Sequence, residues 1–433
     1  MSQKPVIAVF DVGKTNKKVF LFDEDYRVVF EKSAHLAETA DQDDFPCENL
    51  ENLRAYVFDS LKEIERLKEF QIKAVNFSAY GASFVLVDAK GQAIAPLYNY
   101  LKPYPEELSD RLYSSYGGKT RFAAETASPA LGSLNSGLQL YRLKNEKPDL
   151  FKRIRYALHL PQYLSSLLTG RFYSDITSIG CHTALWDFEK NGYHQWVTQE
   201  GILPKLAEIK SSDTVLQKSE KDYLAGIGLH DSSAALIPYL KSFDEPFVLI
   251  STGTWSISMN PFNHSPLTSS ELENDCLCYL TYSGNPVKSS RLFAGHEHDE
   301  QVKRIAEHFH VDISYFKNLT FSEEFVNGPD YDLPEHKTAT EAYHQFMAHL
   351  IQKQVKSTNL IMTSAVKKIF VDGGFSRNVI FMNLLAKAYP KMEVFAASMA
   401  QASALGAAMT IHKHWNSKPL PGNVIQLKHY API

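Results

Sequence analysis

The feature that most constrains this chain is a pattern that occurs twice: a short apolar strand, a tight turn rich in glycine and threonine, and a second strand. The first copy consists of VIAVF at 6–10, the turn DVGKTNKK and VFLF at 19–22. The second is PFVLISTGTWSISMNP at 246–261. Short runs of β-branched and apolar residues predict strands that are covered on both faces. Two such copies, each near the start of one half of the chain, predict two domains of similar fold.

Length and composition agree with two domains and exclude several classes of protein. The chain has 433 residues, and single hydrophobic cores stop growing at about 250–300 residues. A net charge of -4 provides no basic field for a polyanion, so nucleic acid is not expected as a partner. The N-terminal residues lack the pattern of a secretion signal, and no apolar run approaches the ~20 residues of a spanning helix. We therefore expect a cytoplasmic protein with no membrane partner.

The remaining pattern predicts an α/β chain. Apolar residues at helical spacing predict a helix from about residue 53 to 70, followed by strands at 74–77 and 84–88. Residues 138–169 read as helical, interrupted at Pro148 and ended by Gly170. The stretch ASALGAAMTIHKHW, from residue 402, predicts a final helix with small residues on a close-packing face. After Pro419 we expect irregular structure.

A charged residue near the end of the first strand indicates a bound cation. Asp11 follows the buried run, and burying a carboxylate is costly unless it is paired or bound to a cation. Mg²⁺ prefers carboxylate oxygens and keeps several of its waters, so we expect Asp11 to hold Mg²⁺ through water. The alternative is a bulged hairpin with a solvated lysine tip.

A third glycine turn completes a nucleotide-site pattern. In IFVDGGFSRN, residues 369–378, a strand ends in Asp372, two glycines follow, and a helix is expected to begin near Ser376. Glycines between a strand and a helix let the backbone approach a phosphate or a sugar. The turns DVGKTNKK, STGT and DGGFSRN together predict a nucleotide site, because their backbone N–H groups and hydroxyls suit phosphates.

With these motifs, essentially the whole chain resembles the FGGY family of carbohydrate kinases, within the actin, hexokinase and heat-shock-chaperone ATPase superfamily. DVGKTNKK resembles the first phosphate motif, STGTWS the second, and DGGFSRN with ASALGAA the adenosine motif. GIGLHDSSAAL and YGASFVLVDAKGQAIAP are most similar to segments of the L-rhamnulokinase and L-fuculokinase members. The resemblance implies an α/β fold with two RNase H-like domains flanking a central cleft, which closes on substrate. We expect residues 1–243 to bind the sugar and supply the catalytic base, and residues 244–433 to bind the nucleotide.

The resemblance also implies roles for individual residues. Asp231, in HDSSAAL at 230–236, matches the general base that accepts the proton of a sugar hydroxyl. The other residues that match family positions are Thr15, Asn16 and Lys18 for the ATP phosphates, Gly253 and Thr254 for the γ-phosphoryl group, Gly373, Gly374 and Asn378 for the nucleoside, and Gly81 and His230 for the sugar. Asp231 also fits a helix N-cap, and each glycine also fits a turn that needs a positive φ.

Several positions depart from the family pattern. Lys14 stands where a small residue is usual, and Lys17 is expected to add a second positive charge at the hairpin tip. Ser78 and Ser83 replace two carboxylates of the sugar segment, and a YRD-like run becomes YLK at 100–102. Because polar groups that pair with sugar hydroxyls discriminate strongly, these changes leave the exact sugar open.

Two metal-binding hypotheses are weak in the sequence. In GHEHDE, residues 295–300, His296 and His298 share a face only on a strand, whereas the following residues predict a helix. We interpret the segment as a polar helix start at the edge of the active cleft. The four cysteines lack the spacing of a zinc site, so we expect them to be buried apolar side chains.

The sequence therefore predicts a kinase that uses ATP and Mg²⁺ to phosphorylate a small sugar. The favoured acceptor is the terminal primary hydroxyl of a deoxy-ketose such as L-rhamnulose or L-fuculose, with xylulose, ribulose or glycerol as alternatives. Many relatives dimerise, so a homodimer is an open expectation. The rival hypotheses are a sugar or nucleotide sensor without catalysis, and an actin-like or chaperone-like ATPase. One fold hosts many functions, so the fold alone does not separate them.

Overall fold

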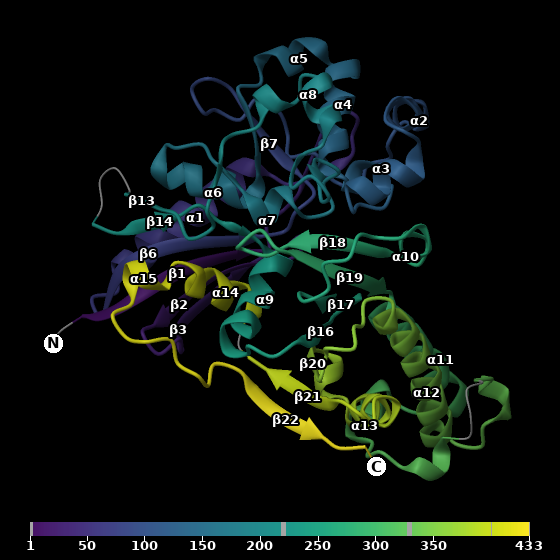
Figure 1. Ribbon diagram of the computed structural model, residues 1–433. Coiled ribbons are helices and arrows are strands. Elements are labelled where there is room, and N and C mark those ends of the chain that lie inside the picture. The colour runs from purple at the N-terminus through teal and green to yellow at the C-terminus, as the bar shows by residue number, and fades with distance from the viewer. Residues whose placement is uncertain (1–2, 218–221, 327–330, 400, 433) are drawn as a thin grey trace. The chain divides into compact units, whose positions relative to one another are not determined.

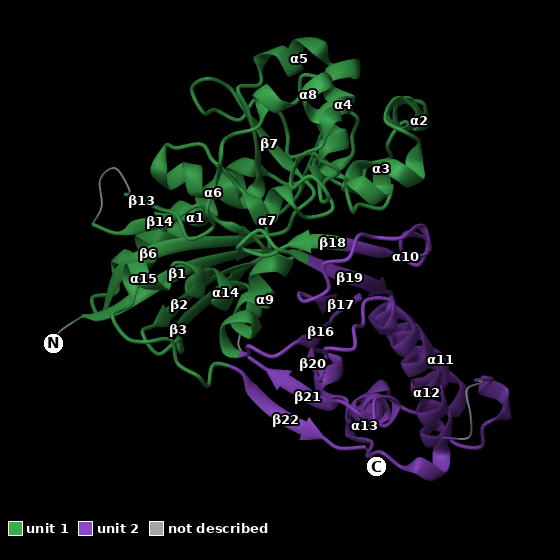
Figure 2. Ribbon diagram, in the orientation of Figure 1, with its two compact units in different colours: residues 1–242, 278–286, 400–424 green, residues 243–277, 287–399, 425–433 purple. Residues whose placement is uncertain are grey.

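The computed structural model describes residues 3–217, 222–326, 331–399 and 401–432. Its packing divides the chain into two units, which Figure 2 shows in different colours: unit 1 comprises 1–242, 278–286 and 400–424, and unit 2 comprises 243–277, 287–399 and 425–433. The sequence predicts one boundary at residue 243. The first division falls within one residue of it, but two later segments, 278–286 and 400–424, pack with unit 1.

Unit 1 is built around a mixed sheet with the strand order β13-β14-β6-β1-β2-β3, in which β15 also pairs with β6. Its strands are β1 (Lys4–Val12), β2 (Lys17–Asp23), β3 (Val28–Ala34), β6 (Phe70–Ala79), β13 (Val215–Gln217), β14 (Leu224–Gly226) and β15 (Leu229–His230). The predicted hairpin is confirmed, because β1 pairs with β2 antiparallel, while β1 and β6 are parallel. The strand extends past Asp11 to Val12, so Asp11 lies within the pairing, opposite Lys18.

Helices cover both faces of this sheet (Figure 1). On one face lie α1 (Leu50–Glu65) and α6 (Leu160–Thr169), whose apolar residues join those of β1 and β6 in one buried core. On the other lie α9 (Asp231–Ser242) and α14 (Ala402–Thr410), followed by α15 (His412–Trp415). A Cβ on Gly406 would lie 1.8 Å from the carbonyl oxygen of Ala234, so glycine lets α14 cross closely over α9. The predicted close-packing face is thus confirmed, and it fixes α14 in unit 1.

The rest of unit 1 forms a second core that includes Phe122, Leu138 and Trp196. Its elements are α2 (Glu106–Ser115), α3 (Lys119–Glu125), α4 (Ser136–Glu146), α5 (Pro148–Arg153), α7 (Ile176–Ile179), α8 (Gln195–Gln199), β7 (Phe84–Val87) and β8 (Tyr156–His159), with the short pairs β4 (Thr39–Ala40) and β5 (Pro46–Cys47), β9 (Ser174–Asp175) and β12 (Ile209–Lys210), and β10 (Trp186–Asp187) and β11 (Gly192–Tyr193). Short 3-10 turns occur at Gly132–Leu134 and Leu203–Lys205.

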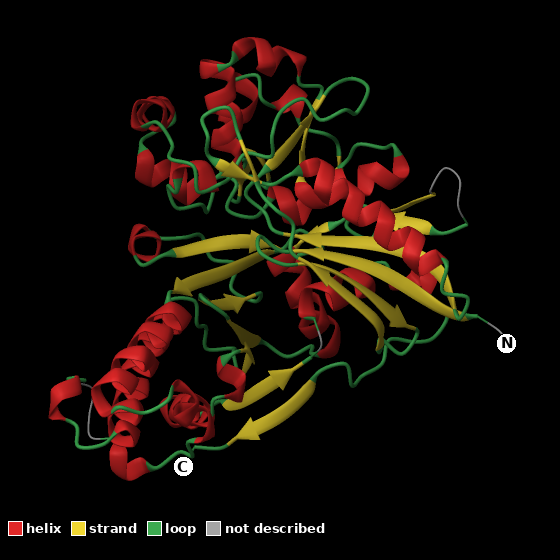
Figure 3. Cartoon of the chain, turned by 180° about the vertical axis from the view of Figure 1, so that it is seen from behind, coloured by secondary structure: helices red, strands yellow, loops and turns green. Residues whose placement is uncertain are grey.

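Unit 2 contains most of a second sheet, with the order β18-β19-β17-β16-β20-β21-β22; residues 278–280 of β18 and Pro286 of β19 belong to unit 1. Its strands are β16 (Phe247–Thr252), β17 (Ser256–Asn260), β18 (Cys276–Leu280), β19 (Pro286–Leu292), β20 (Lys368–Gly373), β21 (Glu393–Ser398) and β22 (Gln426–Tyr430). Its helices are α10 (Ser269–Glu273), α11 (Ala294–Phe309), α12 (Ala339–Asn359) and α13 (Val379–Ala388), with 3-10 turns at Ile313–Asn318, Glu323–Phe325, Leu333–Glu335 and Phe375–Arg377. Figure 3 shows these elements from behind, with helices and strands in different colours.

The two sheets confirm the predicted duplication. The order β3-β2-β1-β6-β14 in unit 1 matches β19-β17-β16-β20-β21 in unit 2. In each sheet, the first two strands form an antiparallel hairpin, β1 with β2 and β16 with β17. The first strand of each hairpin also pairs in parallel with a later strand, β1 with β6 and β16 with β20. The fold class predicted from the sequence, two α/β domains of the RNase H type, is therefore confirmed.

Three local predictions were wrong. The helix predicted at 53–70 is α1, which begins at Leu50 because Asn49 caps it and ends at Glu65. The helical reading of 138–169 missed β8, whose residues pair with β7. The tail after Pro419 is not wholly irregular, because β22 pairs antiparallel with β21. Each error concerns a boundary or a pairing set by distant residues.

A helix that crosses a bilayer requires both sufficient length and high hydropathy. Among the described residues, none forms a helix with enough apolar length to span a membrane.

Candidate functional site

Asp231 lies where a strand meets a helix in unit 1. His230 ends β15, which pairs with the end of β6, and α9 begins at Asp231. The Ser232 backbone N–H donates to Asp231 Oδ1 at 2.6 Å, so the carboxylate is held at the helix N-terminus. Although 34% of its side chain is exposed, burial of the carboxylate raises the pKa of Asp231 to about 6. A carboxyl with that pKa is largely ionised at neutral pH and is a stronger proton acceptor than an ordinary aspartate.

Asp11 is the second carboxylate of unit 1 with a raised pKa. Burial raises the pKa of Asp11 to about 6, the hydrogen bond from Ser403 lowers it, and the charge of Asp231 raises it further. Ser403 Oγ donates to Asp11 Oδ2 at 2.9 Å. The structure thus brings together Asp11 and Asp231, which are 220 positions apart in the sequence. A partly exposed carboxylate beside a hydroxyl fits a Mg²⁺ ion held through water.

Ser403 was missed as a site residue in the sequence. The ASALGAA segment resembles part of the adenosine motif, whereas the structure packs α14 within unit 1, with Ser403 against Asp11. No local signal marks this contact, because it joins residues almost 400 positions apart.

Gly81 and His230 are close neighbours in unit 1. A Cβ on Gly81 would lie 2.8 Å from Cys181 Sγ and 2.9 Å from His230 Cδ2, so only glycine lets these two side chains pack against the backbone there. His230 Nε2 lies 3.3 Å from Asp231 Oδ1. Burial lowers the pKa of His230 to about 4, so the imidazole is neutral at pH 7 and its contact with Asp231 is not an ion pair.

A buried carboxylate supports this arrangement from behind. Asp175 accepts hydrogen bonds from the hydroxyls of Thr177 and Ser212, and Thr177 Oγ1 accepts one from the His230 backbone N–H at 3.0 Å. Burial raises the pKa of Asp175 to about 6. The chain Asp175–Thr177–His230 therefore fixes the backbone immediately before Asp231. Asp175 was missed in the sequence; in the structure it also caps α7 by accepting the Thr177 N–H.

The tip of the first hairpin presents Thr15 and Asn16 to solvent. The Gly13 N–H donates to the Asn16 carbonyl at 2.9 Å and closes the turn. Lys18 forms an ion pair with Glu31 at 3.1 Å, so its ammonium group is already partnered within the sheet.

The expectation that Lys17 adds charge at this tip was wrong. Lys17 is only 2% exposed, and its Nζ lies 2.9 Å from Glu48 Oε1. Lys17 Nζ also donates to the Lys14 carbonyl at 2.9 Å, and Tyr80 donates to Glu48 at 3.4 Å. The lysine lies on an inward-facing strand position, where its charge ties the turn to the core instead of extending into solvent.

In unit 2, two of the predicted turns meet. Gly253 and Thr254 are exposed between β16 and β17, while Gly373 and Gly374 are exposed after β20. The Gly374 N–H donates to the Thr252 carbonyl at 3.0 Å. Gly373 has φ +79°, and a Cβ there would lie 1.8 Å from the Thr252 carbonyl oxygen, so this position requires glycine.

The GHEHDE segment also contacts the STGT turn. The His296 N–H donates to the Thr254 carbonyl at 3.2 Å, and a Cβ on Gly295 would lie 1.9 Å from the Gly253 carbonyl oxygen. The segment is the first turn of α11, as its interpretation as a helix start predicts. It supports the exposed Gly253–Thr254 turn from behind.

Asn378 lies at a large open pocket of unit 2. It caps α13 by accepting the Phe381 N–H, and its Nδ2 donates to Tyr343 Oη at 2.7 Å. The helix begins at Val379, after a 3-10 turn, and not near Ser376 as predicted. The pocket encloses about 1150 Å³, including open solvent; it is lined by His298, Asp299, Val302, Ile313, Phe316, Lys317, Leu319, Tyr343, Gly374, Arg377, Asn378 and Val379. Its lining mixes apolar side chains with polar and charged ones, and apolar surface beside polar groups at a glycine turn suits a planar ring.

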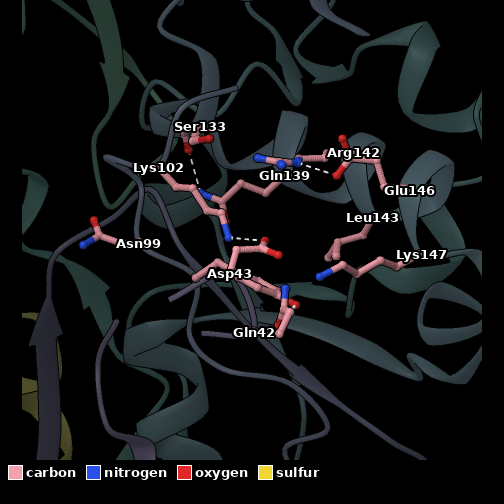
Figure 4. A pocket seen from close by; sticks show the side chains of 11 residues that line it. Gln42, Asp43, Asn99, Lys102, Ser133, Gln139, Arg142, Leu143, Glu146 and Lys147 are labelled. Carbon is pink, nitrogen blue, oxygen red and sulfur yellow. Dashed lines mark hydrogen bonds and ion pairs between the residues drawn. The ribbon is translucent and has the colours of Figure 1, made fainter. Parts of the chain in front are cut away.

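The departures in the sugar segment have structural partners. Ser83 is buried and donates to the Tyr98 carbonyl at 2.9 Å, so its hydroxyl is occupied by the backbone. Lys102 forms ion pairs with Asp41 and Asp43. Lys102 lines a hollow of about 390 Å³ in unit 1 (Figure 4). The positively charged side chains of Arg142 and Lys147 line the same hollow. In this hollow the charges largely neutralise one another, as the dashed lines from Lys102 and Arg142 in Figure 4 illustrate.

Comparison with known proteins places both halves of the chain in one family. Residues 6–234 match the N-terminal domain of the FGGY family of carbohydrate kinases, and residues 244–419 match the FGGY carbohydrate kinase C-terminal domain. The L-fuculokinase of Escherichia coli (strain K12) is 26% identical over 277 residues, which cover 59% of this chain and 57% of that protein. The rhamnulokinase of Halalkalibacterium halodurans is 25% identical over 214 residues, 46% of this chain and 45% of that one. These alignments thus span about half the length of the curated relatives.

Solved structures share the fold along the whole chain. A carbohydrate kinase from Novosphingobium aromaticivorans has a TM-score of 0.80 at 22% identity, covering 100% of this chain and 95% of that one. A ligand-bound xylulose kinase from Lactobacillus acidophilus has a TM-score of 0.81 at 15% identity, covering 99% and 94%. At these identities the likeness establishes the fold alone. With the two family matches, which span most of its length, the chain belongs to the FGGY family of carbohydrate kinases.

Proposed function

We propose that this protein is an ATP-dependent kinase that phosphorylates the terminal primary hydroxyl of a deoxy-ketose such as L-rhamnulose or L-fuculose. Asp231 is the general base in this proposal. The single observation that carries it is the environment of Asp231: a carboxylate fixed at the start of α9, partly open to solvent, with its pKa raised to about 6.

The reaction needs a group that removes a proton and a site that holds the phosphates. In the proposed step, the hydroxyl oxygen of the sugar bonds to the γ-phosphorus while its proton passes to an Asp231 oxygen, and ADP leaves with the bridging oxygen. The transition state of such transfers is loose, so orientation of the hydroxyl supplies much of the rate enhancement. The Asp175–Thr177–His230 chain holds Asp231 in position, and His230 and Gly81 border the proposed sugar.

We assign the phosphates to the exposed turns. Thr15, Asn16 and Lys18 on the first hairpin, and Gly253 and Thr254 on the second, offer N–H, hydroxyl and ammonium donors. Lys18 is paired with Glu31, so its contact with phosphate requires exchange of that partner. Mg²⁺, held by Asp11 through water, would neutralise part of the phosphate charge when bound.

We assign the nucleoside to the open pocket of unit 2 beside Gly373, Gly374 and Asn378. Phe316 and Ile313 provide apolar surface there, and the Asn378–Tyr343 pair provides polar edges. The absence of a side chain at Gly374 leaves room for a ligand to approach the backbone.

The acceptor is inferred from two of the curated relatives. L-fuculokinase and rhamnulokinase are named for deoxy-ketoses, whereas solved neighbours include xylulose kinases and a glycerol kinase. Ser78 and Ser83 are smaller than the carboxylates they replace, so a different ketose or a polyol is the alternative acceptor. A sensor that binds sugar or nucleotide without turnover is the alternative of another class, and the raised pKa of Asp231 argues against it, since binding alone needs no base.

The test of this function is a coupled assay of ADP release with Mg-ATP and a panel of acceptors. The panel contains L-rhamnulose, L-fuculose, xylulose, ribulose, gluconate and glycerol. We expect sugar-dependent turnover that is highest with a 6-deoxy-ketose. Turnover with another member would change the acceptor but keep the kinase, whereas ATP binding without turnover for any acceptor would favour the sensor.

The raised pKa values predict a distinctive pH profile. Because Asp231 accepts a proton only when ionised, kcat/KM should rise with pH and reach half its plateau near pH 6, falling about tenfold per unit below it. The measurement is kcat/KM from pH 5 to 8.5 at saturating Mg-ATP. Asp11 titrates in the same range, so the acid limb of the parent should steepen beyond the tenfold per unit that Asp231 alone gives, and Asp11→Asn should restore the tenfold slope. A profile that stays flat down to pH 5 would contradict the assignment.

A further inference from the structure

Three side chains of types that bind transition metals converge beside Asp231. Cys181 and His182 follow α7, and His230 ends β15. The sulfur of Cys181 and one nitrogen from each histidine all lie within 4.8 Å of one another. Cys181 and His230 are buried, while His182 is partly exposed. The cluster therefore has two buried donors and a third that is partly exposed.

The inner donor atoms pack against the same glycine. A Cβ on Gly81 would lie 2.8 Å from Cys181 Sγ and 3.1 Å from His230 Nε2, so both atoms lie directly against the backbone of Gly81. The rings of His182 and His230 are 6.2 Å apart in a T-shaped arrangement, and the Tyr279 ring lies 5.7 Å from His230. Glycine thus lets the sulfur and the nitrogen approach the same point of the backbone.

Secondary contacts hold the buried histidine. The His230 N–H donates to Thr177 Oγ1 at 3.0 Å, and His230 Nδ1 lies 3.4 Å from Ser233 Oγ, whereas the Cys181 thiol donates to the Ser178 carbonyl at 3.2 Å, a contact that the thiolate would give up. Groups that orient ligands in this way typically strengthen a metal site. Tetrahedral Zn²⁺ bonds of about 2.0–2.3 Å separate donor atoms by roughly 3.5 Å, so donors that lie within 4.8 Å of one another need only a small contraction to hold the ion.

We propose that Cys181, His182 and His230 form a binding site for a borderline-soft divalent cation such as Zn²⁺, with a water as the fourth ligand. One thiolate and two imidazoles favour Zn²⁺ over the hard Mg²⁺, which takes oxygen ligands. On binding, the thiol of Cys181 loses its proton to the buffer and the sulfur bonds to the ion. This site is distinct from the Mg²⁺ assigned to Asp11.

The position of the site predicts inhibition of the kinase, a consequence that rests on the proposed function. His230 Nε2 lies 3.3 Å from Asp231 Oδ1, so an ion on His230 places a positive charge beside the base and takes the space assigned to the acceptor. Zn²⁺ should therefore compete with the sugar and leave ATP binding unchanged.

The direct test uses Co²⁺ as a spectroscopic probe of the purified full chain. We expect one equivalent of Co²⁺ to produce a sulfur-to-cobalt charge-transfer band together with the strong visible absorption of a tetrahedral ion, and Zn²⁺ to displace it. Cys181→Ser should abolish the charge-transfer band, and His182→Ala should weaken binding by about a hundredfold or more, since even outer-shell changes cost 10–100-fold.

Cys47→Ser is the matched control, because Cys47 is also a buried thiol of unit 1. It should keep the band with unchanged affinity, and melting curves should show that every variant is folded. A parent without the band, or a band that survives in Cys181→Ser, overturns the proposal. This measurement needs neither ATP nor sugar. It can therefore detect the metal site even if the protein is not a kinase, and it can exclude the metal site even if the protein is one.

Discussion

Replacing Asp231 with asparagine should lower sugar-dependent ADP release by about 10²–10⁴-fold, the usual contribution of a positioned general base. Asparagine has nearly the same shape, so it keeps the start of α9 while it removes the proton acceptor. The measurement is kcat in the coupled assay at saturating Mg-ATP and acceptor, with nucleotide affinity measured separately. We expect ATP affinity to be almost unchanged, because the loss concerns proton transfer.

The thermal stability of the same variant provides an independent check. The pKa of Asp231 is about 6 in the folded protein and 3.8 in the reference state, so folding favours the protonated carboxyl. That stabilisation is present below pH 3.8 and is lost as the pH rises through about 6. Asp231→Asn should therefore raise the melting temperature at pH 7.5 and have a smaller effect at pH 5. Asp244→Asn, at an exposed position, should change neither turnover nor melting. Full activity in Asp231→Asn would exclude this residue as the base.

Removing Glu48 should produce the second large effect, a loss of about 3–5 kcal/mol in the stability of unit 1. Glu48→Ala leaves the Lys17 ammonium buried without its carboxylate, and Lys17 is only 2% exposed. The measurement is the free energy of unfolding in urea, followed by a probe in unit 1. Because Lys17 also holds the Lys14 carbonyl at the hairpin tip, the variant should raise the KM for ATP as well.

Two controls separate the buried ion pair from general damage. Lys17→Met combined with Glu48→Leu replaces both charges with apolar groups of similar size and should recover most of the stability, since buried pairs often exchange for apolar residues at little net cost. Glu31→Ala breaks the more exposed ion pair with Lys18 and should cost less than about 1 kcal/mol. If Glu48→Ala lowered the free energy of unfolding no more than Glu31→Ala does, the buried pair would not be a major support of the hairpin.

Local sequence patterns predicted much of the fold correctly. The hairpin that contains Asp11, the turn after Phe247–Thr252 and the strand that leads to Gly373 all appear where the sequence indicates them. Each depends on a short run whose burial and turn chemistry are encoded by neighbouring residues. The positive φ of Gly373 is also predictable from the sequence, because a pair of glycines after a buried strand indicates a tight turn.

The sequence by itself therefore determined the duplicated α/β architecture, the family resemblance and the candidate base, because period, turn residues and motifs are local. Only the tertiary structure decided that Ser403 contacts Asp11, that Lys17 turns inward to Glu48, and that Cys181 meets His230. These contacts join residues from about 30 to almost 400 positions apart. Their partners are set by how the sheet and its covering helices pack, and that packing cannot be read from neighbouring residues.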